Sequence, residues 1–237
     1  MSADIHKFWV IIPAAGRSRR MQHVASPKQY LPLAGRTVIE WAIAPFIERA
    51  DCVGVVVVTA PDDRQLQQLA LSRDARIRTV SSGGAERSDS VLAGIRSLRA
   101  LCSDQDWVLV HDAARPCLEA ADLDKLIGSL RDDAVGGLLA APVVDTLKRA
   151  DDEQRVAETV SREKLWRALT PQMFRYGVLS RALSEASQRG VPVTDEAQAV
   201  ELLALKPRLV AGSADNFKIT LAEDLERAER ILAERCR

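Results

Sequence analysis

Short, unbroken runs of apolar residues, many of them β-branched, recur along this chain of 237 residues. Such runs are typical of strands buried on both faces, because a half-exposed strand alternates polar and apolar residues. They predict four strands, at residues 8–12, 53–59, 107–110 and 137–144, and two shorter strands are expected near residues 77–80 and 208–210. Apolar residues at helical spacing predict helices at residues 38–47, 62–71, 90–101, 121–130, 177–188, 195–205 and 221–235. The alternation indicates an α/β fold with a Rossmann-like, mostly parallel central sheet flanked by helices.

Residues 145–164 do not fit this alternation. They include six acids and five bases but few apolar side chains, so they cannot form a core strand or a core helix. Three forms remain open for them: an exposed hairpin arm, a lid or a mobile loop. As a hairpin they would make a polar β-arm that protrudes from an otherwise single domain spanning residues 1–237.

The composition excludes several classes of protein. With 33 basic and 33 acidic residues the formal net charge is zero, which argues against a nucleic-acid binder or a protein of anionic membrane surfaces. No apolar run approaches the roughly 20 residues that span a bilayer, and no export signal is evident at the N-terminus. The four cysteines are scattered and form no CxxC pair, so reduced thiols and a cytoplasmic location are expected.

The charges are nevertheless unevenly distributed. Between Asp4 and the next acid, Glu40, lie six basic residues: Lys7, Arg17, Arg19, Arg20, Lys28 and Arg36. Residues 13–20 follow the first predicted strand, and ligands of parallel sheets bind beyond the carboxyl ends of strands. Small residues there allow a close backbone approach, and arginines balance phosphate charge. This predicts a polyphosphate site, with a solvated basic turn as the alternative. Neither the dinucleotide fingerprint nor the P-loop pattern occurs.

Three further segments are candidates for the same site. Paired glycines, Gly83 and Gly84, precede a predicted helix, where nearby serines could either contact a ligand or cap the helix. Asp112 follows the strand 107–110 and could hold Mg²⁺ opposite phosphates, or form a salt bridge with Arg115 as scaffolding. Lys218 stands between two apolar residues and could be a positioned residue or a surface lysine. His111, which directly precedes Asp112, is interpreted as a structural residue.

Taken together, these motifs resemble one family: the 2-C-methyl-D-erythritol 4-phosphate cytidylyltransferases of the non-mevalonate isoprenoid pathway. The resemblance runs through nearly the whole chain, in an ordered series of short motifs. They are Pro13-Ala14-Ala15-Gly16 with Arg20, Pro27-Lys28-Gln29, Gly83-Gly84, Glu86-Arg87, Asp89-Ser90-Val91, His111 to Pro116, Asp145 to Lys148, Leu169 to Gln172, Thr194 to Ala197 and Asn216 to Thr220.

The resemblance implies an activity and a set of site residues. The 4-phosphate of the substrate would attack the α-phosphorus of CTP, giving 4-diphosphocytidyl-2-C-methyl-D-erythritol and pyrophosphate, with Arg20 and Lys28 as catalytic residues. Mg²⁺, or another hard divalent cation, would bind at Asp112. The implied nucleotide-binding residues are Pro13, Ala14, Ala15, Gly16, Gly84, Ala85, Ser90, Asp112, Ala113 and Arg115. Two positions depart from the family pattern: Ala85 replaces a residue that is often acidic, and Arg17 one that is commonly small or apolar.

For methylerythritol phosphate, the resemblance implies binding by Thr146, Arg162, Thr170, Thr194 and Lys218. Members of the family dimerise through a protruding arm that lends its arginine to the neighbouring subunit's site. Residues 145–164 are the candidate for that arm and Arg162 for that arginine, so the resemblance implies a homodimer with composite active sites.

Two other functions remain open at this point. One is a related pyrophosphorylase that uses another sugar or alditol phosphate, because the choice of CTP rests on a few backbone contacts. The other is a nucleotide-binding regulatory module whose arm recruits a partner. The regulatory module would bind nucleotide without turnover and would tolerate Lys28→Ala.

Overall fold

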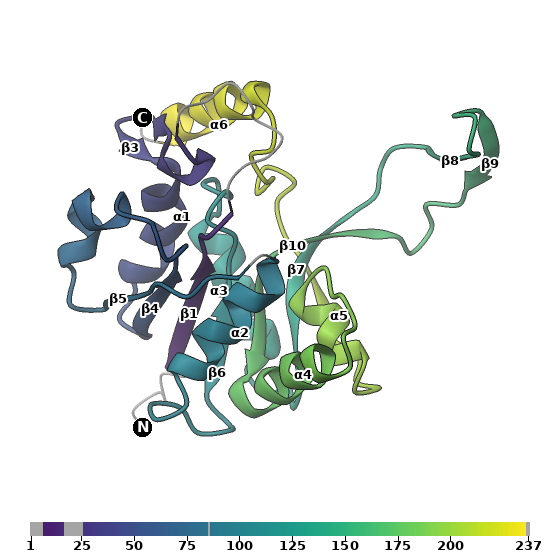
Figure 1. The fold of residues 1–237 in the computed structure, drawn as a ribbon. Helices are drawn as coiled ribbons and strands as arrows, with labels where there is room; N and C mark the ends of the chain where they lie inside the picture. Colours follow the sequence, from purple (N-terminus) through teal and green to yellow (C-terminus); the bar gives the residue numbers. More distant parts are fainter. Residues whose placement is uncertain (1–6, 17–25, 85, 236–237) are drawn as a thin grey trace.

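The computed structural model describes residues 7–16, 26–84 and 86–235. A seven-stranded sheet forms its centre, in the order β11-β7-β10-β6-β1-β4-β5 (Figure 1). Its strands are β1 (Phe8–Pro13), β4 (Cys52–Val58), β5 (Ile77–Val80), β6 (Trp107–Val110), β7 (Gly136–Pro142), β10 (Trp166–Arg175) and β11 (Arg208–Ala211). β1 runs parallel to both of its neighbours, β4 and β6, and only β10 is antiparallel to the strands beside it. The expected α/β class with a mostly parallel sheet is confirmed.

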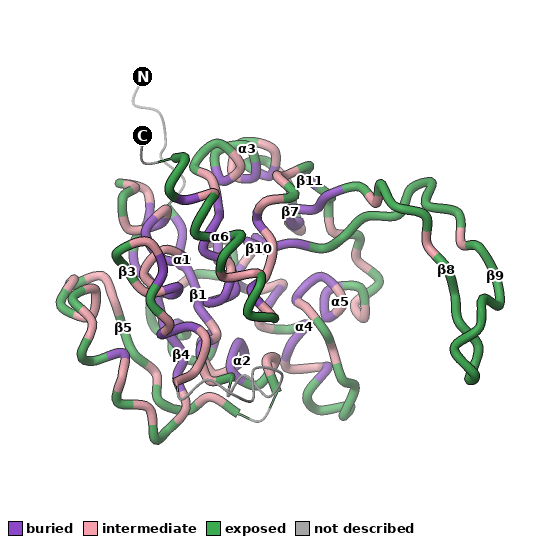
Figure 2. Tube along the Cα trace, turned by 90° about the horizontal axis from the view of Figure 1, so that it is seen from above, coloured by how far each residue is buried: buried purple, intermediate pink, exposed green. Residues whose placement is uncertain are grey.

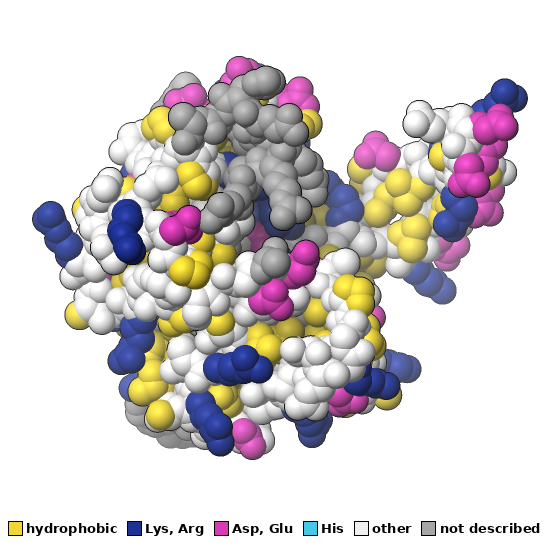
Figure 3. Space-filling view, viewed as in Figure 1, with side chains coloured by type: hydrophobic (Ala, Val, Ile, Leu, Met, Phe, Trp, Pro, Cys, Tyr) yellow, Lys and Arg dark blue, Asp and Glu magenta, His cyan; other side chains and the backbone are white. Residues whose placement is uncertain are grey.

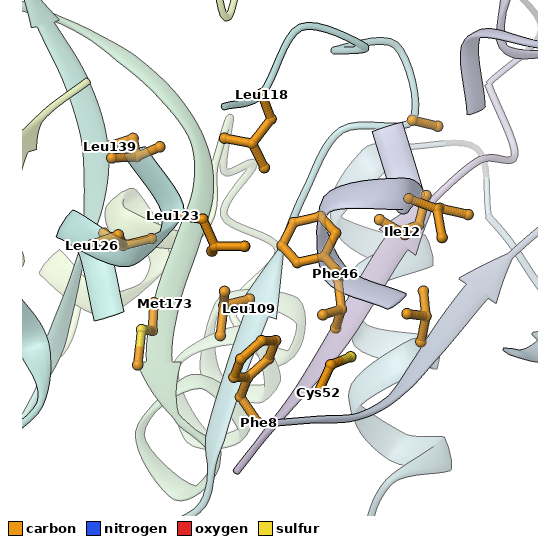
Figure 4. Packing of buried hydrophobic residues seen from close by; sticks show 14 of the residues in the cluster. Phe8, Ile12, Phe46, Cys52, Leu109, Leu118, Leu123, Leu126, Leu139 and Met173 are labelled. Atoms are coloured by element: carbon orange, nitrogen blue, oxygen red, sulfur yellow. The ribbon is translucent and has the colours of Figure 1, made fainter. Parts of the chain in front are cut away.

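Helices cover both faces of the sheet, as β1 illustrates. Successive side chains of a strand point to opposite faces, and those of β1 alternate between two hydrophobic clusters. The first cluster joins Phe8 and Ile12 to α1 (Val38–Ile47) and α3 (Ala120–Leu130) (Figure 4). The second joins Trp9 and Ile11 to α2 (Arg87–Ser97), α4 (Tyr176–Gln188) and α5 (Glu196–Glu201). The double burial explains why this strand is an unbroken apolar run.

The last helix, α6 (Ala222–Arg235), packs away from the sheet. It forms a third cluster with the small hairpin of β2 (Pro32–Leu33) and β3 (Arg36–Thr37), and this cluster includes the fully buried Ile219. Arg235 also donates a hydrogen bond to the carbonyl of Cys117 and pairs with Glu119. The segment that carries Lys218 is therefore held between α6 and the loop after β6.

A second hairpin stands away from the body of the molecule (Figure 1). β8 (Leu147–Ala150) and β9 (Val156–Val160) pair antiparallel in a two-stranded sheet of their own. Its residues are almost all exposed (Figure 2), and both signs of charge lie on its surface (Figure 3). The structure thus has a hairpin where the sequence left three forms open.

The largest differences from the sequence-based prediction are at β10 and at residues 62–71. β10 was not predicted: Pro171 and the polar Thr170 and Gln172 interrupt its apolar pattern, and proline normally argues against a central strand. The strand accommodates Pro171 through a shift in its pairing with β7 between Ala168 and Gln172.

The helix predicted at residues 62–71 is wrong as well. Two short 3₁₀ helices, η2 (Leu66–Gln68) and η3 (Ala70–Arg73), occupy this region, separated by an extended Leu69. The carboxylate of Asp63 accepts hydrogen bonds from the backbone N–H groups of Gln65 and Leu66. A local side-chain acceptor of this kind offers the backbone an alternative to helical bonding.

Candidate active site

Loops from separate parts of the chain converge at one edge of the sheet. β1, β4, β5 and β6 are mutually parallel, so their carboxyl ends meet at that edge. Gln29 ties the loop after β1 in place: its side-chain amide donates to the carbonyl of Ala14 at 2.7 Å and to that of Gly16 at 3.5 Å. Lys28 is thereby placed beside residues 14–16, the loop predicted to hold polyphosphate.

The loop after β5 packs directly against the loop after β1. The N–H of Gly83 donates to the carbonyl of Thr59 at 2.9 Å. A Cβ atom at Gly83 would overlap that of Ala15, come within 2.8 Å of the Thr59 oxygen and lie 3.2 Å from the hydroxyl of Ser90. Glycine is required here by close approach, which leaves the backbone of both loops available at the predicted nucleotide site.

We expect Gly83→Ala to raise the KM for CTP at least about tenfold, because the added methyl must push the Ala15 loop out of position. Steady-state kinetics with CTP as the varied substrate measures the effect. Gly128→Ala is the matched control, since nothing lies within 4 Å of a Cβ added there, on α3. Equal KM values in the two variants would show that this contact does not shape the site.

The segment that bears Lys218 lies next to Lys28. The ammonium group of Lys28 donates to the carbonyl oxygen of Ile219 at 2.7 Å, across 191 positions of sequence. Arg115 donates to the carbonyl oxygen of Asn216 at 2.7 Å. Lys218 itself is half-buried and turns to Asp112, with 3.2 Å between its Nζ and Oδ2 of the carboxylate. It is therefore a positioned residue rather than a surface lysine.

Asp112 is the centre of a network of ion pairs. Its Oδ1 accepts from Nε of Arg87 at 2.8 Å, and its Oδ2 contacts Nε of Arg115 at 3.1 Å as well as Lys218. Burial by itself would raise the pKa of Asp112, but the charges of Arg87, Lys218 and Arg115 hold it well below its ordinary value. The scaffolding pair with Arg115 that the sequence left open is present, together with two further cations.

A second buried carboxylate, Glu196, shares Arg87 with Asp112. Its Oε1 and Oε2 accept from Nη1 and Nη2 of Arg87 at 2.5 and 3.1 Å. Burial raises the pKa of Glu196, and the charge of Arg87 opposes that effect. Counting Lys28, the described part of the site has four cations and two carboxylates, an excess of positive charge that suits a phosphorylated ligand.

His111 is fully occupied in positioning the loop after β6. Its Nε2 lies 3.1 Å from the carbonyl oxygen of Arg115, an acceptor only, so Nε2 carries the proton. Nδ1 therefore accepts from the hydroxyl of Thr170 at 2.9 Å, and that hydroxyl accepts from the N–H of Asp112 at 3.1 Å. Burial lowers the pKa of His111 to about 4. The neutral imidazole supports the interpretation of His111 as structural.

Acid should weaken the fold through His111. The unfolded chain protonates His111 near its ordinary pKa of 6.5, whereas the folded chain does so only near 4, so acid favours unfolding between these values. At 1.36 kcal/mol per pKa unit the loss is about 3 kcal/mol. Denaturant unfolding at pH 6.5 and pH 4 measures this loss. The difference in free energy of unfolding between the wild type and His111→Gln should shrink by this amount from pH 6.5 to pH 4. A difference independent of pH would contradict the assignment.

The remaining predicted residues occupy different places. Ser90 is buried inside α2, which begins at Arg87, so neither Ser88 nor Ser90 caps that helix. Thr194 is exposed, and its hydroxyl donates to the side chain of Gln198. Thr146 directly precedes β8 and Arg162 follows β9, so both flank the hairpin that stands away from the body of the molecule (Figure 1). Arg20 and Ala85, like Arg17 and Arg19, lie outside the described residues.

Comparisons with known proteins point to one family. The model of the family IspD, 2-C-methyl-D-erythritol 4-phosphate cytidylyltransferase, matches residues 8–234. A protein of that name from Ectopseudomonas mendocina (strain ymp) is 53% identical over 232 residues, covering 98% of each chain. The chain belongs to this family. Among solved structures, the enzyme of that name from Francisella tularensis has a TM-score of 0.82 at 31% identity, over 95% of this chain and 99% of that one.

A further crystal structure, of a 4-diphosphocytidyl-2C-methyl-D-erythritol synthase, has a TM-score of 0.83 at 36% identity, over 96% of this chain and 99% of that one. Family membership makes the chain a cytidylyltransferase, whose reaction joins CTP and methylerythritol phosphate into 4-diphosphocytidyl-2-C-methyl-D-erythritol. The predicted activity and pathway are confirmed.

The sequence did not indicate that Arg87 and Glu196 belong to the site. Both stand in motifs that carry the family resemblance, Glu86-Arg87 and Thr194 to Ala197. The two residues are 109 positions apart, so no local pattern in the sequence indicates their ion pair. Contact between α2 and α5 across one face of the sheet was needed to reveal it.

Proposed function

We propose that the cytidylyl transfer takes place at the sheet edge where Lys28, Asp112 and Lys218 converge. The observation that carries the proposal is that convergence: three segments far apart in sequence bring a net positive charge next to a glycine-lined loop pair. CTP would lie along residues 13–16 and 83–84, with Ser90, Ala113 and Arg115 beside it. The family resemblance assigns Ala85 to this nucleotide site and Arg20 to the catalytic residues.

In this proposal a 4-phosphate oxygen of methylerythritol phosphate forms a bond to the α-phosphorus of CTP. The bond from that phosphorus to the bridging oxygen breaks, and its electron pair leaves with pyrophosphate. Lys28 and Arg20 stabilise the charge that develops on the transferred phosphoryl group. No general base is required, because the attacking phosphate is already largely ionised at neutral pH. This agrees with the full occupation of both nitrogens of His111.

The donor set at Asp112 fits Mg²⁺ bound together with a triphosphate. The described residues include no cluster of three side chains that could hold a metal ion by themselves. Mg²⁺ needs no such cluster, because it commonly binds through one or two carboxylates plus substrate phosphates and water. When bound, the ion would neutralise charge on the triphosphate. Lys218 would turn from Asp112 toward the acceptor phosphate, a movement that its half-exposed side chain allows.

For the acceptor we propose binding by Lys218, Thr170, Thr194 and, from a second subunit, Thr146 and Arg162. The arm supports a homodimer because its base exposes apolar side chains: Val144 is 70% exposed and Trp166 is 38% exposed. Arg162 lies at the same base and donates to the carbonyl of Val144. A partner that covers this apolar surface would receive Arg162 at its own site.

Mixed dimers test the composite site. Lys28→Ala and Arg162→Ala should each be nearly inactive alone, yet a re-equilibrated equimolar mixture should recover about a quarter of the wild-type rate. Random pairing makes half of the dimers mixed, and each mixed dimer contains one site with both residues intact. The measurement is pyrophosphate release after subunit exchange. An exchanging mixture that stays as inactive as its components would refute the shared site.

We also propose that one domain carries the whole activity and works in the cytoplasm. The described cysteines, Cys52, Cys102 and Cys117, are free thiols, which supports a reducing compartment. None of the helices in the described part of the chain is long and apolar enough to cross a membrane.

Pyrophosphate release with each of the four nucleoside triphosphates, with and without methylerythritol phosphate and Mg²⁺, tests the proposed function. We expect release with CTP that depends on both the acceptor and the ion. Release with UTP and a hexose phosphate would indicate a related pyrophosphorylase instead. Nucleotide binding without any turnover, unaffected by Lys28→Ala, would indicate a regulatory module.

A further inference from the structure

Glu196 is a buried carboxylate that the proposed reaction does not use. It is 1% exposed, and it binds Arg87 through both of its oxygens. A buried carboxylate is costly unless it is paired and hydrogen-bonded. Glu196 lies next to the site, one residue after Asp195, the N-cap of α5. Packing alone does not account for a charged side chain at this buried position.

The geometry of Arg87 connects the two carboxylates of the site. Its guanidinium is a rigid planar fork, so two contacts along one edge fix its orientation. Glu196 holds the edge made by Nη1 and Nη2, which directs the remaining Nε to Oδ1 of Asp112 at 2.8 Å. Oδ2 of Asp112 is then the oxygen that faces Lys218.

Glu196 is itself held in a defined position. Gln172 of β10 accepts a hydrogen bond from the N–H of Ala197 at 2.8 Å and donates one to Asp195 at 3.1 Å. Asp195 in turn caps α5 by accepting from the N–H of Gln198 at 2.8 Å. The start of α5 is thus tied to the central sheet, and Glu196 extends from it to α2 as a fixed support.

The charges give Glu196 a second effect. If Glu196 were neutral, Asp112 alone would have to balance the full charge of Arg87. It would do so while also balancing the charges of Arg115 and Lys218. Because Glu196 shares the charge of Arg87, Asp112 keeps more of its negative charge for the groups on its other side. In the proposed function Lys218 has turned to the acceptor phosphate, so these groups are the triphosphate and the Mg²⁺ that would bind with it.

We infer that Glu196 is a positioning residue of this active site, which acts through Arg87 to orient the carboxylate of Asp112 and to preserve its charge. The inference rests on the proposed function, because it assigns Asp112 to the reacting complex. It differs from a purely structural role, in which Glu196 would only join α5 to α2.

A double-mutant cycle on kcat/KM for CTP tests this inference. Glu196→Gln should lower kcat/KM about 10-fold to 100-fold, the range seen when groups that orient a metal ligand are removed. Arg87→Gln should cause a similar loss. The double variant should be no worse than Arg87→Gln, since Glu196 has no path to Asp112 except through Arg87. Glu196→Asp, which keeps the charge, should recover part of the activity.

The controls separate positioning from stability and from the reaction itself. Glu185→Gln removes an exposed carboxylate of α4 that pairs with Arg189. This change should leave kcat/KM unchanged. Thermal melting identifies unfolding, and if Glu196→Gln is unfolded, Glu196→Asp carries the test. A folded variant with wild-type kinetics, or losses that multiply in the double variant, would overturn the inference. A wild-type protein that releases no pyrophosphate from CTP and methylerythritol phosphate would instead overturn the proposed function.

Discussion

Replacing Lys28 by alanine is expected to lower kcat by about 100-fold to 1,000-fold, the loss typical for a preorganised group that stabilises transition-state charge. Its ammonium group is fixed against the carbonyl of Ile219 at 2.7 Å, so it is oriented before substrate binds. Because the charge develops mainly in the transition state, kcat should fall much more than the affinity for CTP. Single-turnover kinetics at saturating CTP and methylerythritol phosphate measures the effect.

The chain offers a close control for this variant. Lys125 also donates from its ammonium group to a backbone carbonyl at 2.7 Å, that of Ala211, but it does so on α3 at the exposed surface. Lys125→Ala removes the same kind of hydrogen bond outside the site. We expect wild-type kcat in that variant. Equal losses in both would mean that Lys28 acts by holding the fold.

The second large effect is expected at Asp112. Asp112→Asn should lower the free energy of unfolding by about 3 kcal/mol or more, because three cations lose the carboxylate that they share in a buried setting. The pKa of Asp112 lies well below that of an unfolded aspartate. Its contribution to stability is therefore present above the unfolded pKa, and is lost only as the pH falls through the much lower folded value.

Urea unfolding at neutral pH measures this loss, with Asp74→Asn as the comparison. Asp74 pairs with Arg76 at the surface, where such pairs contribute about 1 kcal/mol or less. Pyrophosphate release should also be nearly abolished in Asp112→Asn and unchanged in Asp74→Asn. Similar stabilities for the two variants would contradict the network described around Asp112.

Much of the fold could be predicted because burial on both faces leaves a direct mark on sequence. The strand β6 (Trp107–Val110) and the helix α1 (Val38–Ile47) have the predicted boundaries, since every strand residue in β6 is buried and α1 packs an apolar face on the sheet. β10 could not be predicted, because two of its residues, Thr170 and Gln172, are polar inside the core. Their hydrogen bonds to His111 and Asp195 come from distant segments.

The site was predictable in part for a related reason. Motifs after strands indicated which loops meet, and Lys28, Asp112 and Lys218 do lie together at the sheet edge. No local pattern shows that Arg87 links Asp112 to Glu196, because the link depends on how α2 and α5 pack on one face of the sheet. Pairings between distant segments arise from the fold and leave no spacing rule in the sequence.

The most direct test of the proposed reaction is ³¹P NMR of wild-type protein incubated with CTP, methylerythritol phosphate and Mg²⁺. Attack at the α-phosphorus predicts that each molecule of acceptor consumed yields one pyrophosphate and one diphosphate-bridged cytidine product. The acceptor's own phosphorus should then appear in that bridge. Release of orthophosphate with CDP, or of pyrophosphate without loss of the acceptor signal, would contradict the account.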